Sequence, residues 1–329
     1  MATCLFRSPL AFRLQSFLDV RRAAGRKDVG TARILRNLDG FLCGDLKSGD
    51  TITRDVADRW IRSMAHLCVN TRINQISVLR QFCAYLRHFD PRTCIVHRSF
   101  LPHRCRPAPY IYSFKEVRRI LAAARRIGPP GSLRPAVLYT LIGLLYTTGI
   151  RIGEALRLTL ADIDPRRRLL LVRETKFRKT RLVPLSESAT RSLCAFLRRR
   201  RLAGFPTAPS AAVFVNPQGR AYGAPRICAV LLEILRCLGI RAPSPQRGPR
   251  IHDFRHTFAV HRLMAWYREG ANVPAKLPLL STYLGHSTLI GTEAYLHATA
   301  ELLEHAGRRF HDFFLAPALR REKSHVGPG

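Results

Sequence analysis

Residues 251–257 read IHDFRHT, residues 284–287 read LGHS, and a tyrosine, Tyr295, follows shortly afterwards. His252 and Arg255 stand three positions apart at the start of a predicted helix, so both side chains can converge on one point. A phosphate at that point would meet the arginine fork and the unpaired N–H groups of the helix start. This stretch therefore predicts a site for a phosphate ester.

Two basic residues upstream extend this site. Arg151 opens a short predicted helix within residues 147–154, TTGIRIGE, and Lys176 lies in a polar loop between predicted strands at 169–173 and 180–184. The whole set is Arg151, Lys176, His252, Arg255, His286 and Tyr295. A tyrosine hydroxyl, with a pKa of about 10, needs a proton acceptor or a cationic environment before it can attack phosphorus. Together these side chains would make a phosphoryl-transfer site that uses no metal ion.

The order and spacing of the six residues resemble the active site of the tyrosine recombinases, also called the phage integrase family. The family pattern is Arg, Lys, His-x-x-Arg, Leu-Gly-His and Tyr, and residues 113–314 resemble it closely. The resemblance implies that Tyr295 is the nucleophile and forms a 3′-phosphotyrosyl link to DNA. It also implies that Lys176 is the general acid for the leaving 5′-oxygen and that Arg151 contacts the scissile phosphate. The segment after the lysine, KTRLVPL, sets the register on Lys176, with Lys179 as the alternative.

The remaining members of the set have implied roles in handling charge. Arg255 and the imidazole of His286 would stabilise the negative charge that builds on the phosphate oxygens. His252 would take the proton from the tyrosine. Glu154, three residues after the first arginine, would hold the fold around it. No cofactor is expected, because the cations would replace the metal ions that most phosphoryl-transfer enzymes use.

The charge balance predicts a polyanionic partner. The chain has 329 residues, with 55 Lys plus Arg against 22 Asp plus Glu, which gives a formal charge of +33. Double-stranded DNA fits better than a membrane surface, because there is no apolar run of about 18 residues and the basic residues are spread along the chain. The nine cysteines are odd in number and scattered. They favour a reducing location, which we expect to be the cytoplasm of a bacterium and its nucleoid, and they give no spacing typical of a metal site.

Composition and periodicity predict two domains and a mainly α fold with a small β-sheet. We expect an all-α DNA-binding domain at 1–90 with about four helices, a basic Pro-rich linker at 91–112, an α+β catalytic domain with a C-terminal helix at 113–316, and a flexible tail at 317–329. Gly40, Gly44 and Gly49 are expected to separate helices. Exposed arginines of the first domain favour a surface that faces DNA: Arg59, Arg62, Arg72, Arg80 and Arg87.

Further elements are expected in the second domain. SFKE at 113–116 is a capping box before a helix, and the nearly all-apolar residues 133–147 predict a buried helix. Helices are also predicted at 186–202, 225–238 and 279–285, and a short strand at 213–215. Tyr283 is the rival to Tyr295 as nucleophile, but its apolar neighbours indicate a packing residue.

The sequence therefore predicts a site-specific DNA recombinase of a mobile element or plasmid, independent of metal and ATP. The resemblance implies that it acts as a homotetramer on paired DNA sites, with the C-terminal helix docked on the neighbouring protomer. Two alternatives stay open: a type IB topoisomerase, and an inactive or regulatory DNA-binding protein of the same fold.

Overall fold

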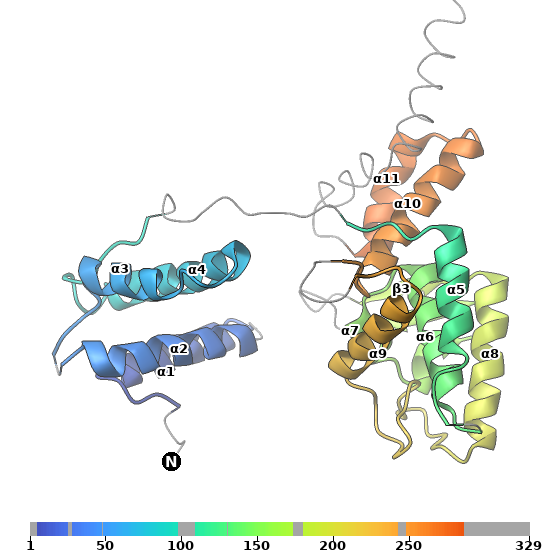
Figure 1. Cartoon of the computed structure of the whole chain (residues 1–329), viewed down its shortest axis with the longest axis horizontal. Helices are drawn as coiled ribbons and strands as arrows, with labels where there is room; N and C mark the ends of the chain where they lie inside the picture. The colour runs from blue at the N-terminus through green and yellow to red at the C-terminus, as the bar shows by residue number, and fades with distance from the viewer. Residues whose placement is uncertain are drawn as a thin grey trace, which may run out of the picture. The chain divides into compact units, whose positions relative to one another are not determined.

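The computed structural model describes residues 5–25, 28–47, 49–97, 109–129, 131–173, 180–242 and 248–285. The chain forms two compact units, Met1–Pro107 and Ala108–Gly329, and each has its own hydrophobic core (Figure 1). The predicted fold class is confirmed, since the chain is mainly helical with one small sheet. Within the described residues, no helix is both long and apolar enough to cross a bilayer. Lys176, His286, Tyr295, the predicted C-terminal helix, the tail at 317–329 and residues 98–108 of the predicted linker lie outside the described residues.

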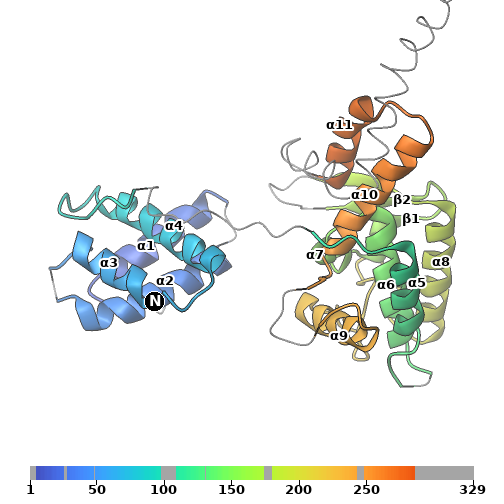
Figure 2. The same ribbon diagram turned by 45° about the horizontal axis from the view of Figure 1, so that its top comes forward.

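The first unit is a cluster of helices around one apolar core, as Figure 2 shows. The helices are α1 (Ala11–Ala23), α2 (Val29–Asp45), α3 (Arg54–Ser63) and α4 (Val69–Leu86). In α4, Ile76, Leu79 and Phe82 recur at helical spacing and are fully buried. The apolar periodicity of the sequence therefore located these elements correctly.

The glycines of α2 do not separate helices as expected. Gly40 and Gly44 lie inside α2, and nothing lies within 4 Å of a Cβ added at either position. A glycine in a helix costs only about 1 kcal/mol relative to alanine, and the buried Leu35, Leu38 and Leu42 on the other face outweigh that cost. Gly49 does mark a turn, with φ of +84°.

Both described ends of the predicted linker are packed. Cys94 N–H donates to the Ile52 carbonyl at 2.8 Å, and Val96 is buried in the core of the first unit. On the other side, Tyr112 is fully buried in the second unit. The proline content of this segment predicted an extended chain. Its apolar side chains Val96 and Tyr112 are nevertheless buried in the cores of the first and second units.

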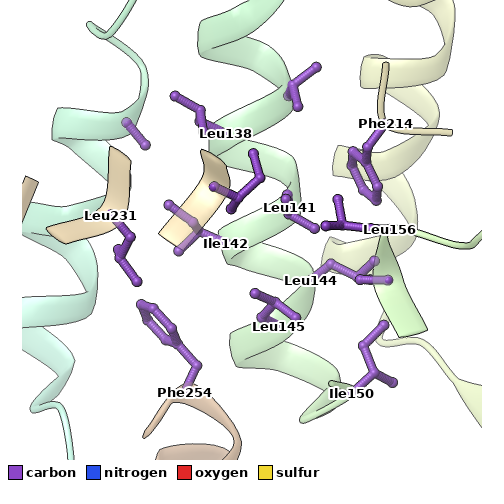
Figure 3. Packing of buried hydrophobic residues seen from close by; sticks show 14 of the residues in the cluster. Leu138, Leu141, Ile142, Leu144, Leu145, Ile150, Leu156, Phe214, Leu231 and Phe254 are labelled. Atoms are coloured by element: carbon purple, nitrogen blue, oxygen red, sulfur yellow. The ribbon is translucent and has the colours of Figure 1, made fainter. Parts of the chain in front are cut away.

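The second unit is organised around α6 (Arg134–Thr148), which packs against three other helices (Figure 1). Those are α5 (Phe114–Ala124), α8 (Glu187–Leu202) and α10 (Asp253–Arg268), while α9 (Ala224–Cys237) packs on α5 and α11 (Val273–Leu284) on α10. Figure 3 shows Leu138 and Ile142 of α6 in one cluster with Leu231 of α9 and Phe254 of α10. The predicted buried helix is thus the centre of this unit.

A three-stranded antiparallel sheet, with α7 (Ile152–Ala155) and a 3-10 turn (Leu160–Asp162) before it, completes the unit. Its strands are β1 (Ile163–Asp164), β2 (Leu169–Val172) and β3 (Arg181–Pro184). Leu170 pairs with Val183, and both are fully buried. The two predicted strands are confirmed, and the two-residue β1 was not foreseen.

Two predicted elements differ from the structure. Residues 213–215 form no strand; two isolated bridges lie in this region, Thr159 with Ala212 and Val215 with Ala221. Helix α11 begins at Val273, six residues before the predicted start, and contains Pro278. Pro274 in the first turn loses no helical hydrogen bond, whereas Pro278 inside the helix removes one. The Asn272 side chain caps the start of α11 by accepting from Ala275 N–H.

Candidate active site

Two helices end at glycines that carry the chain toward predicted site residues. Gly149 ends α6 with φ of +62°, and Gly285 ends α11 with φ of +70°. A Cβ added at Gly149 would lie 2.6 Å from Phe258 Cδ1, so both the backbone angle and the space require glycine there. The chain can therefore turn at the end of α6, and this turn brings Arg151 close to the C-terminal end of α11.

Arg255 joins these two helix ends. Its side chain is buried, and it donates from Nη1 to the Gly149 carbonyl at 2.9 Å and from Nη2 to the Leu284 carbonyl at 2.7 Å. The C-terminal ends of helices carry partial negative charge, so a buried guanidinium between two of them is well stabilised. The first turn of α10 is thereby fixed against the ends of α6 and α11.

Arg151 is held by a carboxylate from its own helix. Glu154 accepts from the Arg151 backbone N–H at 3.0 Å and from its Nη1 at 2.8 Å. Burial disfavours the charged carboxylate, but hydrogen bonds from Arg181 and Arg151 outweigh it and lower the pKa of Glu154 to about 2. The Arg151 side chain keeps a third of its surface exposed, 33%, so it can meet a ligand from solvent.

His252 precedes α10, and its imidazole is exposed. Loss of hydration beside the protein surface, followed by the charges of His256, Arg255 and Arg151, lowers the pKa of His252 to about 4. Arg255 follows His252 by three residues at the start of α10 and binds the carbonyl of Gly149, two residues before Arg151, so the three site residues lie at one end of the unit. At neutral pH the ring is uncharged and can accept a proton.

Aromatic packing holds the start of α10 in place. Phe254 stacks on Tyr112 with ring centroids 4.6 Å apart, and the Tyr112 hydroxyl donates to the Arg250 carbonyl at 3.1 Å. The buried Asp253 carboxylate accepts from Arg250 N–H at 2.7 Å. Phe254, where the family commonly has leucine, thus forms a packed contact that orients the residues on either side.

Tyr283, the rival nucleophile, is a packing residue. Its ring stacks on Phe258 at 5.5 Å, and its hydroxyl donates to the Pro184 carbonyl at 3.4 Å. Burial raises the pKa of Tyr283 to about 12, so its hydroxyl is harder to ionise than that of an exposed tyrosine.

The structure brings Arg151, His252 and Arg255 together and does not describe the other three predicted site residues. It adds Arg181, which the sequence placed only in a predicted strand and in the KTRLVPL segment, with no role in the site. The signal for it is spatial, because its partners Glu154 and Tyr283 lie 27 and 102 residues away in the chain. Among the described residues, no three His, Cys, Asp or Glu side chains gather as a metal site would need.

Known proteins are similar to this chain over most of its length. The sequence model described as the phage integrase family matches residues 112–301. The chain is 35% identical over 302 residues to the putative integrase/recombinase y4rB of Sinorhizobium fredii, covering 90% of this chain and 95% of that protein. It is 31% identical over 291 residues to the tyrosine recombinase XerC of Mycobacterium sp. (strain KMS), covering 84% of this chain and 88% of the relative.

Solved structures share the fold. XerH site-specific recombinase, bound to palindromic difH substrate in a post-cleavage complex, superposes with a TM-score of 0.67 at 21% identity, covering 91% of this chain and 84% of that one. The Tn1549 transposon integrase, in complex with transposon right end DNA, superposes with a TM-score of 0.65 at 18% identity, covering 90% of this chain and 98% of that one.

Proposed function

The chain belongs to the phage integrase family of tyrosine recombinases, and from this we propose that it cuts and rejoins double-stranded DNA at specific sites through a 3′-phosphotyrosyl intermediate. The observation that carries the proposal is the placement of Arg151, His252 and Arg255 together where α6, α10 and α11 meet. Residues 113–316 would be the catalytic domain. The DNA would belong to a mobile element or plasmid in the bacterial cytoplasm, at the nucleoid.

In the proposed reaction, Tyr295 Oη attacks the scissile phosphorus and the bond to the 5′-oxygen breaks. The neutral imidazole of His252 accepts the tyrosine proton, and Lys176 protonates the leaving oxygen. Arg151 contacts the phosphate, and Arg255 and His286 add positive charge beside it. The phosphotyrosyl bond keeps the energy of the phosphodiester, so rejoining needs no ATP. The arginines would supply the charge stabilisation for which other enzymes use a metal ion.

Residues 1–90 would hold the DNA next to the site being cut. A groove of about 880 Å³ lies among α2, α3 and α4 of the first unit. Arginine and asparagine side chains that can contact phosphates and base edges line it: Arg33, Asn37 and Asn74. None of the five arginines expected from the sequence to face DNA lines this groove, so the groove is a separate candidate for the DNA-binding surface.

Trapping the covalent protein–DNA adduct tests this function. The full chain is incubated with plasmid DNA of its source, denatured, and the attached DNA is sequenced to identify the site. We expect an adduct in excess EDTA, and its loss in Tyr295→Phe with unchanged DNA affinity. Tyr283→Phe is the matched control and should keep the adduct. An adduct that maps to Tyr283, or that requires magnesium, would refute the mechanism, while relaxation of DNA without any specific site would indicate a topoisomerase.

We further propose that a homotetramer acts on paired DNA sites. The support is a set of large apolar side chains after the nucleophile, more than an exposed segment usually carries. They are Leu302, Leu303, Phe310, Phe313 and Phe314. A chain ended after Ala300 should bind a single site and fail to form the paired-site complex in gel-shift assays. Recombination by that truncated chain would contradict the proposal.

A further inference from the structure

Arg181, the first residue of β3, contacts two separate parts of the site. Its Nε donates to the Tyr283 carbonyl near the end of α11 at 3.0 Å, and its Nη2 donates to Glu154 Oε2 at 2.8 Å. A Cβ added at Gly285 would lie 3.1 Å from Arg181 Nη1, so the guanidinium also lies against the turn that ends α11. Only 12% of the Arg181 side chain is exposed.

The Glu154 carboxylate is therefore shared by two arginines. Arg151 Nη1 binds Oε1 at 2.8 Å, while Arg181 binds Oε2 at 2.8 Å and approaches Oε1 at 3.4 Å. One negative charge faces two positive charges, so the group of three keeps a net charge of +1. The Arg151 side chain is 33% exposed and that of Arg181 12%. An anion arriving from solvent can therefore reach the surplus positive charge at Arg151.

We propose that Arg181 is a positioning residue that keeps the Arg151 guanidinium available to the scissile phosphate. The inference rests on the proposed function and assigns a role to a residue outside the six-residue set. Arg181 and the Arg151 backbone N–H both donate to Oε2, so Oε1 is the oxygen left to the Arg151 guanidinium, which binds Glu154 through that one oxygen. Bidentate pairing would neutralise Arg151 and draw it toward the protein. Arg181 also fixes the distance between α7 and the end of α11, because one guanidinium binds both.

The geometry of the guanidinium is needed for this role. The Nη1 and Nη2 end of the planar group faces the Glu154 carboxylate, while Nε–H lies on another side of it and reaches the Tyr283 carbonyl. An ammonium group is a single point charge and cannot replace both contacts. Arg181→Lys should therefore keep a positive charge near Glu154 and lose the hydrogen bond to the Tyr283 carbonyl of α11.

Single-turnover cleavage tests the proposal, with two duplexes that carry the site identified by trapping. One has a phosphodiester at the scissile position and the other a neutral methylphosphonate, which needs no cation to balance its charge. Arg181→Met should cleave the phosphodiester on the order of 10²-fold more slowly than the wild type. On the methylphosphonate, Arg181→Met should be slower than the wild type by only a few fold, and its DNA affinity should stay within about threefold of the wild-type value. The cleavage rate of Arg181→Lys should lie between those of Arg181→Met and the wild type.

Arg173→Met is the matched control. Arg173 also pairs with a buried carboxylate, that of Asp162, in the same sheet, but that carboxylate binds Thr159 and not Arg151. This variant should cleave both duplexes as the wild type does. Equal deficits of Arg181→Met on the two duplexes, or wild-type rates on both, would overturn the positioning role.

A crystal structure of Arg181→Met gives a readout that does not depend on cleavage. We expect the Arg151 guanidinium to donate to both oxygens of Glu154 in that variant, whereas in the wild type it donates to Oε1 and the backbone N–H to Oε2. An unchanged Arg151 would overturn the inference even if the chain cleaves DNA. If the wild type forms no adduct, the proposed function fails, and the crystal structure still decides whether Arg181 sets the position of Arg151.

Discussion

Replacing Gly149 with alanine should destabilise the second unit more than an ordinary glycine substitution does. Two costs add at this position. A side chain at φ of +62° costs about 1–2 kcal/mol, and forcing a methyl group to 2.6 Å from Phe258 and 3.0 Å from Leu284 costs about 1–3 kcal/mol more. We therefore expect a loss of roughly 2–5 kcal/mol in the free energy of unfolding. The Gly149 carbonyl also accepts from Arg255, so cleavage should fall as well.

The chain offers a matched control and a convenient probe. Gly270, after α10, has φ of +68° and nothing within 4 Å of an added Cβ, so Gly270→Ala should cost only about 1–2 kcal/mol. The chain has two tryptophans, Trp60 in the first unit and Trp266 in the second. Urea unfolding followed by fluorescence in a Trp60→Phe background therefore reports the second unit. Equal losses for the two alanine variants would refute the steric argument, because only Gly149 makes the close contacts.

Three further outcomes are expected. Loss of hydration beside the protein surface and nearby cations hold the pKa of His252 at about 4, below its ordinary 6.5. Adduct formation should therefore stay level from pH 7 to 5, and a decline centred near 6.5 would contradict a neutral His252 as proton acceptor. The same shift makes the unfolded chain bind more protons below 6.5, so the stability contributed by His252 should be lost as the pH falls from 6.5 to about 4, which urea midpoints at each pH would measure. DNA binding should weaken steeply with salt, and Arg33→Gln in the groove should reduce the slope of log K against log salt by about 0.9. Arg22 pairs with Asp19 outside the groove, so Arg22→Gln should leave this slope unchanged.

Local patterns in the sequence predicted the parts of the site that depend on local spacing. His252 and Arg255 stand on one helical turn, and the glycine before Arg151 marks a helix end, so both features can be identified without coordinates. The strands around Lys176 were recognised from alternation and turn residues. Where these patterns misled, a single residue was given too much weight: glycines were taken as helix ends in α2, and Pro278 concealed the first half of α11.

The contacts that join these pieces could not be predicted in this way. Arg255 binds backbone carbonyls, and a backbone carbonyl has no residue-type signature. Arg181 in the sequence is one arginine among many in a chain with 55 Lys plus Arg, and its partners come from α7 and α11. Which arginines are buried and paired follows only from the three-dimensional packing.

The long reach of these contacts bears on how the protein is made. The Arg255 contact to Gly149 spans 106 residues, and the Arg181 contact to Tyr283 spans 102. Contacts this far apart in sequence form late, because a long loop must close before they contribute any stabilisation. A ribosome adds about 5–20 residues per second from the N-terminus, so the first helical unit can fold while the carbonyl acceptors at the end of α11 are still unsynthesised. An unfinished nascent chain can thus carry a folded first unit before the contacts that fix Arg255 and Arg181 exist.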